Sequence, residues 1–116
     1  MAEDRNNLLQ ENSRMRLVSW RAKRVGKLYG FATVQLPIGL RLIDVPVVRG
    51  KDGPWAVLPT KPAVDKDGRQ RHGVDGKPAF APVMAWCSRR LEDAFSRRVV
   101  ELVRRAHPAD LVPMAA

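Results

Sequence analysis

An amphipathic helix near the end of the chain constrains the fold most strongly. At about 100° per residue, residues 89–106 gather their apolar side chains on one third of the helix surface. These side chains are Leu91, Phe95, Val99, Leu102, Val103 and Ala106. Ser88 can cap the first turn, and Pro108 ends the helix. An apolar stripe of this kind has to be buried against a second layer of secondary structure.

The residues before this helix predict that the second layer is a β-sheet. Apolar and polar residues alternate in two neighbouring stretches joined by the turn Pro37–Gly39, and the hairpin loop Gly50–Gly53 follows. The strands that we expect are 14–27, 28–36, 40–48, 54–58 and 79–84. Pro46 lies inside the third of them, which indicates an edge position or a bulge because proline has no N–H for the ladder. The predicted fold class is α+β, an antiparallel sheet of four or five strands followed by a long C-terminal helix packed on it.

The length of 116 residues suits a single domain. We place that domain at 14–106, with a loose N-terminal arm at 1–13 and a C-terminal tail at 107–116. Within the domain, residues 59–78 contain several prolines, two Asp-Gly pairs and few apolar anchors. We interpret this segment as either a long mobile hairpin or a loop that orders on binding, because loops of this length in small domains are usually functional or disordered.

The chain is strongly basic. It has 21 Lys and Arg against 12 Asp and Glu, a formal net charge of +9. A small domain with this balance favours an anionic partner, nucleic acid before an acidic membrane surface. No apolar run approaches the roughly 20 residues of a membrane span, and the start lacks the pattern of a secretory signal. Because the single cysteine, Cys87, forms no internal disulfide, we expect a cytoplasmic protein that is not associated with a membrane.

Basic residues are concentrated in two places. Six lie in 14–27, which has no acidic residue, and six arginines lie on the side of the helix opposite the apolar stripe. Arginine suits phosphate because its planar guanidinium donates two parallel hydrogen bonds. The predicted nucleic-acid contacts are Arg89, Arg90, Arg97, Arg98, Arg104 and Arg105 on the helix, with Arg21, Lys23 and Arg24 as a second group. Together these residues predict one positive surface.

Three aromatic residues near these cations are candidates for stacking on bases, namely Trp20, Tyr29 and Phe31. Trp55 and Trp86 are instead expected in the core. The sequence shows no cofactor motif, no metal-ligand spacing around His72 or His107 and no catalytic constellation. We therefore expect a binding protein without cofactor, metal or catalytic residues, and not an enzyme.

The stretch from Phe31 to Lys61 resembles the SpoVG family of small bacterial regulators. The motifs that carry the resemblance are Ala32–Leu36, Leu42–Val45, Val47–Gly50 and Gly53–Lys61, and the last of them is similar to the family's aromatic-Val-x-Met-Pro-Ser-Lys strand end. Over 28–106 the order of strands, loop and C-terminal helix also resembles the family. The resemblance implies a homodimer that binds DNA or RNA and regulates gene expression, with the C-terminal helix and nearby basic residues at the nucleic acid.

Two other functions fit the same residues. A single-strand binder of the Whirly type would use the sheet face with Trp20, Tyr29 and Phe31, and it would lose binding on Phe31→Ala or Trp20→Ala. A protein–protein adaptor for an acidic partner would use the same cations, and it would not bind nucleic acid even at low salt.

Overall fold

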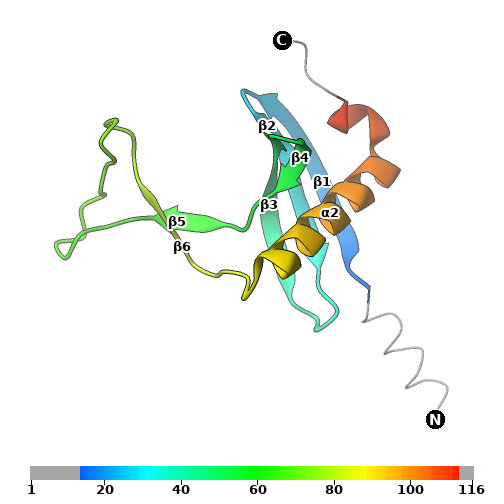
Figure 1. Ribbon diagram of the computed structural model, residues 1–116, viewed down its shortest axis with the longest axis horizontal. Helices are drawn as coiled ribbons and strands as arrows, with labels where there is room; N and C mark the ends of the chain where they lie inside the picture. Colours follow the sequence, from blue (N-terminus) through cyan, green and yellow to red (C-terminus); the bar gives the residue numbers. More distant parts are fainter. Residues whose placement is uncertain (1–13, 113–116) are drawn as a thin grey trace.

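The computed structural model describes residues 14–112 and confirms the α+β class. A four-stranded antiparallel sheet has the order β1-β2-β3-β4, and the 18-residue helix α2 packs on one face of it (Figure 1). The elements are β1 (Arg16–Val25), β2 (Leu28–Gln35), β3 (Arg41–Gly50), β4 (Gly53–Ala56), β5 (Thr60–Pro62), β6 (Phe80–Pro82), α2 (Arg89–Ala106) and the 3-10 helix η1 (Pro108–Leu111). The arm expected at 1–13 and the last four residues, 113–116, lie outside the described residues.

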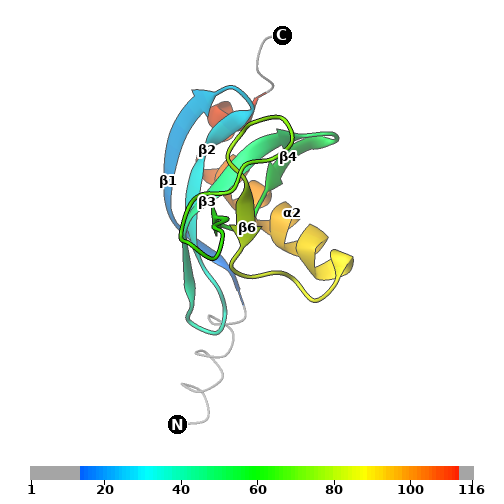
Figure 2. The same cartoon turned by 90° about the vertical axis from the view of Figure 1, so that its left-hand side faces the viewer.

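The core lies between α2 and the sheet face that α2 covers. Val45 and Val47 of β3 and Val99 and Val103 of α2 are fully buried. Leu111 of η1 joins the same core, so the part of the predicted tail that the structure describes, 107–112, packs as part of the domain. The opposite face of the sheet carries no second layer from the described part of the chain (Figure 2).

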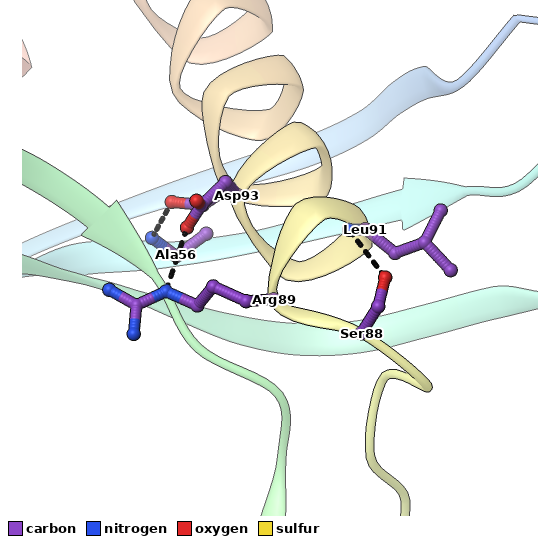
Figure 3. Close-up of polar contacts among 6 residues, drawn as sticks. Ala56, Ser88, Arg89, Leu91 and Asp93 are labelled. Atoms are coloured by element: carbon purple, nitrogen blue, oxygen red, sulfur yellow. Dashed lines mark hydrogen bonds and ion pairs between the residues drawn. The ribbon is translucent and has the colours of Figure 1, made fainter.

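Both ends of α2 lie where the sequence predicts them. Ser88 Oγ accepts a hydrogen bond from Leu91 N at 3.3 Å, which caps the first turn (Figure 3). The helix ends at Ala106, and His107 N donates to Val103 O at 2.7 Å just before Pro108. The Ser88 cap and the proline therefore fix the length of the helix, as expected.

The buried side of α2 is rotated around the helix axis relative to the predicted apolar stripe. Ser96 and Val100 are buried, whereas Leu91 and Ala106 are exposed. Ser96 Oγ accepts a hydrogen bond from Ala56 N of the edge strand β4 at 2.9 Å, and this side of the helix therefore lies on the sheet. The prediction for Leu91 and Ala106 was wrong because a stripe of apolar residues omits a serine that is buried with a backbone partner.

A bulge near the start of β2 reverses the alternation of its side chains. Between Leu28 and Gly30 the strand advances two residues while β3 advances one, from Val48 to Val47. The extra residue places the ring of Tyr29 in the core, where it is 2% exposed. The prediction that Tyr29 lies on the same sheet face as Phe31 was therefore wrong.

Pro46 lies in β3, which is an interior strand, so an edge position was the wrong alternative. The bulge alternative is confirmed, because β3 carries an extra residue between Leu42 and Val45, where Asp44 has a φ of 57°. Pro46 O accepts a hydrogen bond from Val57 N at 3.0 Å, one residue past the end of β4. Proline has no N–H to donate, but at this position the missing hydrogen bond would point toward β4 just where the pairing of β3 with β4 ends.

The segment 60–82 forms a separate arm that projects from the body of the domain (Figure 1). β5 pairs antiparallel with β6, so the predicted fifth strand belongs to this second sheet and not to the first. Beyond the two strands, three backbone hydrogen bonds of 2.8–2.9 Å close a ring through Ala63, Arg71 and Ala79. The ring joins the strands of the arm to the two turns at its end.

The Asp-Gly pairs lie in these two turns, as their sequence predicts. Asp65 opens the first turn, and its Oδ1 accepts hydrogen bonds from two backbone N–H groups; Asp75, in the second pair, accepts one. Gly68 and Gly76 take φ values of 81° and 80°, which side chains other than glycine rarely adopt. The Asp-Gly chemistry therefore gives the end of the arm a defined shape.

Candidate nucleic-acid interface

A groove of about 690 Å³ separates α2 from the hairpin that joins β3 to β4. Ser96 and Val100 lie in it on the helix side, between the sheet and the more exposed side chains of Arg97 and Arg104. Lys51 stands on the hairpin side. Cations from two elements therefore line the same open cleft, together with the carboxylates of Asp52, Asp93 and Glu101.

Two glycines place the hairpin beside this cleft. A Cβ on Gly50 would lie 3.0 Å from Gly53 O and 3.1 Å from the Cβ of Trp55, so the two strands approach too closely for a side chain there. Gly53 has a φ of 123°, which also favours glycine. The tight turn that results carries Lys51 at its tip, which supports the hairpin predicted at Gly50–Gly53.

Half of the arginines of α2 are already paired with acidic residues of the same helix. Arg89 Nε lies 3.3 Å from Asp93 Oδ1 (Figure 3). Glu101 Oε1 lies 2.7 Å from Arg105 Nη2 and 3.5 Å from Arg98 Nη1. These three predicted contacts therefore carry charge that is partly balanced within the helix.

The other three arginines, Arg90, Arg97 and Arg104, form no ion pair with any described residue. They are spaced seven residues apart, which is nearly two helical turns, so they form one row along α2. Neighbouring members of this arginine row are about 10.5 Å apart along the axis. The row is the part of the predicted cationic helix surface that is open to an anionic ligand.

The second predicted group, on β1, is divided by the structure. Arg21 lies 3.6 Å from Asp44 and 5.0 Å above the ring of Phe31, on the sheet face away from α2. Lys23 is exposed. Arg24 donates to three backbone carbonyls of residues 109–112 at 3.2–3.5 Å, so it holds η1 against the β1–β2 hairpin. The structure does not bring these cations together with the arginine row into one surface.

The three aromatic candidates for stacking are also separated. Trp20 faces α2, and its Nε1 donates to Asp110 Oδ2 at 2.9 Å. Tyr29 is buried in the core, so its ring is closed to a base. Only Phe31 lies on the uncovered face of the sheet, and it is partly buried there.

Trp55 is a groove residue that the sequence prediction missed. It was expected in the core, but its side chain is half-buried and lines both the groove and a second, smaller cleft. Lys51 was missed as well. Its place between the two glycines of a predicted hairpin was the available signal, but nothing in the sequence shows that the hairpin borders α2. Trp86, in contrast, packs against the core, with its ring 5.0 Å from Phe95.

Within residues 14–112, the structure has no group of three His, Cys, Asp or Glu side chains that could hold a metal ion. No helix in the same range is long and apolar enough to cross a membrane. The chain matches no protein-family model, no curated protein and no solved structure.

Proposed function

We propose that the chain is a cytoplasmic, homodimeric regulator of gene expression that binds the phosphates of DNA or RNA through the arginine row and Lys51. The observation that carries this proposal is the row itself, because Arg90, Arg97 and Arg104 are left without carboxylate partners among the described residues while their neighbours are paired. Guanidinium groups without internal partners can donate bidentate hydrogen bonds to phosphate without first breaking an ion pair.

The spacing of the row suits a polymer of phosphates. From Arg90 to Arg104 the helix rises about 21 Å, so the three guanidinium groups are too far apart to share one phosphate. Each of them can bind a separate phosphate of a polyanion. Lys51 adds a cation from the opposite side of the groove.

The cations of β1 have different places in this proposal. Arg24 is a structural residue, because its guanidinium is occupied by carbonyls of the C-terminal segment. Arg21 and Lys23 are further contacts for a nucleic acid that extends beyond the groove. The formal net charge of +9 would contribute long-range attraction whichever residues make contact.

Single-strand binding on the uncovered sheet face is the second candidate function. It is favoured by one observation, the stacking of the Arg21 guanidinium 5.0 Å above the Phe31 ring on that face. A base could take the place of the guanidinium on the ring. We rank this function second because Trp20 and Tyr29 do not share the face.

A binding series tests the proposal against its alternatives. The affinity of the full chain is measured for duplex DNA, single-stranded DNA and RNA of equal length at three salt concentrations. We expect the logarithm of the association constant to fall linearly with the logarithm of the salt concentration. On duplex DNA the slope should be about −0.9 for each phosphate contact. No binding of any of the three ligands at low salt would contradict the proposal and would favour the adaptor for an acidic protein.

A further inference from the structure

The arm at 60–82 forms its own small sheet and has few contacts with the rest of the described residues. The two strands of the arm, β5 and β6, pack mainly against each other. Phe80 is 61% exposed and Val64 56%. The projection of the arm contributes to a radius of gyration of 16.8 Å, compared with about 13 Å for a compact domain of 100 residues. Because an isolated two-stranded hairpin is only marginally stable in water, we expect another protein surface to pack against the arm.

An apolar cleft of about 250 Å³ lies at the root of the arm, between the end of β4 and the start of α2. Leu58, Pro82, Met84 and Trp86 line it. Trp86 Nε1 is buried and has no acceptor, although buried N–H groups are almost always hydrogen-bonded. The root cleft therefore presents apolar side chains to solvent, while the Nε1–H group of its tryptophan is buried beneath them.

The arm has charge and apolar surface that suit the root cleft. Five Lys and Arg residues against three Asp residues give the arm a net charge of +2, whereas Glu92 in the cleft forms no ion pair with a described residue. The exposed ring of Phe80 supplies the apolar surface. The arm and the cleft are thus complementary in charge and in apolar surface.

We propose that two copies of the chain exchange arms, so that the arm of each copy covers the root cleft of the other. Phe80 of one copy lies against Met84 and Trp86 of the other. Because each copy supplies one arm and one cleft, a twofold axis satisfies both at once. This inference names the surface of the homodimer, and it stands whether or not the chain binds nucleic acid.

The size and chemistry of the arm favour a second copy over other occupants. A standard protein interface uses about 20–30 residues on each side, and residues 60–82 with the cleft beside them supply such a number. Prolines in both strands oppose the addition of further strands, so the contact closes as a pair and does not extend into a fibre.

Sedimentation equilibrium of the full chain without nucleic acid tests this proposal over a wide range of concentrations. We expect a dimer. Phe80→Asp places a charge in the apolar contact and raises the dimer dissociation constant at least a hundredfold. Met84→Asp places a charge in the root cleft and raises the constant by a similar factor. Ile38→Asp changes an exposed apolar residue of the turn between β2 and β3, outside the arm and the cleft, and serves as the matched control, with a constant like that of the unmodified chain.

A monomer throughout the concentration range would overturn the exchange of arms. A dimer whose dissociation constant is unchanged by both Phe80→Asp and Met84→Asp would overturn it too, because the two copies would then meet elsewhere. Circular dichroism checks that each variant remains folded, which we expect because Phe80 and Met84 lie outside the core. A monomer that still binds nucleic acid with the expected salt dependence would overturn this inference and the homodimeric part of the proposed function, and would leave the proposed nucleic-acid binding intact.

Discussion

Ser96 Oγ accepts a hydrogen bond from the backbone N–H of Ala56 at 2.9 Å, and the serine side chain is almost completely buried. This bond joins the middle of α2 to the free edge of the sheet. It satisfies an outward-facing N–H that would otherwise be open to pairing with another strand. It also sets the distance between helix and hairpin, and with it the width of the groove.

Ser96→Ala is expected to destabilise the fold by about 1–3 kcal/mol, because the Ala56 N–H loses its acceptor in a buried position. The free energy of unfolding in urea measures the loss. Ser19→Ala, at an exposed position of β1, is the control and should stay within about 0.5 kcal/mol of the unmodified chain. Equal stability of both variants would show that the bond contributes nothing to the fold.

Arg24→Ala is expected to loosen the C-terminal segment. The guanidinium holds three carbonyls of residues 109–112, but because it is exposed we expect a loss of only about 1 kcal/mol. Amide hydrogen exchange of residues 107–112 should become faster while exchange in β3 is unchanged. Lys23→Ala removes a neighbouring charge without these bonds, so the same exchange pattern in that variant would contradict the structural role of Arg24.

Phe31 and Tyr29 are expected to respond in opposite ways to truncation. Tyr29→Ala removes a buried ring and should cost about 3–5 kcal/mol of stability, as for other large aromatic residues in cores. Phe31→Ala should cost less and leave nucleic-acid affinity unchanged, because the ring lies away from the groove. Chemical denaturation and binding titrations measure the two effects. A stable Phe31→Ala variant that no longer binds single strands would support the sheet-face function instead.

Lys51→Ala should weaken nucleic-acid binding without changing stability. The lysine lines the groove from the hairpin side, and the loss of one phosphate contact reduces the salt slope by about 1. Titrations at several salt concentrations measure this slope. Lys66→Ala removes an equal charge from the end of the arm, so a similar decrease in that variant would indicate that binding responds only to net charge.

The sequence was sufficient for the α+β class and for the ends of α2. The apolar stripe required a second layer, the alternating strands supplied it, and Ser88 and Pro108 bounded the helix. It was not sufficient for the rotation of the helix or for the place of Tyr29. Both depend on pairings between distant segments, the Ala56–Ser96 hydrogen bond and the bulge between β2 and β3.

For the candidate site, the sequence identified the arginines but not which of them are open. Spacing could not make that distinction, because Glu101 is three or four residues from Arg97 and Arg104 as well as from Arg98 and Arg105, and only the last two are paired with it. The role of Arg24 was not available from the sequence, because its partners are more than eighty residues away. The same holds for the groove, whose second wall is a hairpin that only the tertiary fold brings to α2.

The most direct test of the account compares two double variants that each remove two arginines from α2. Arg97→Ala with Arg104→Ala removes members of the arginine row, whereas Arg98→Ala with Arg105→Ala removes arginines held by Glu101. The net charge is the same in both. We predict that the first pair lowers the salt slope of binding by about 2 and the affinity at least tenfold more than the second does. Equal losses in the two variants, or a larger loss in the second, would contradict the arginine row as the binding surface.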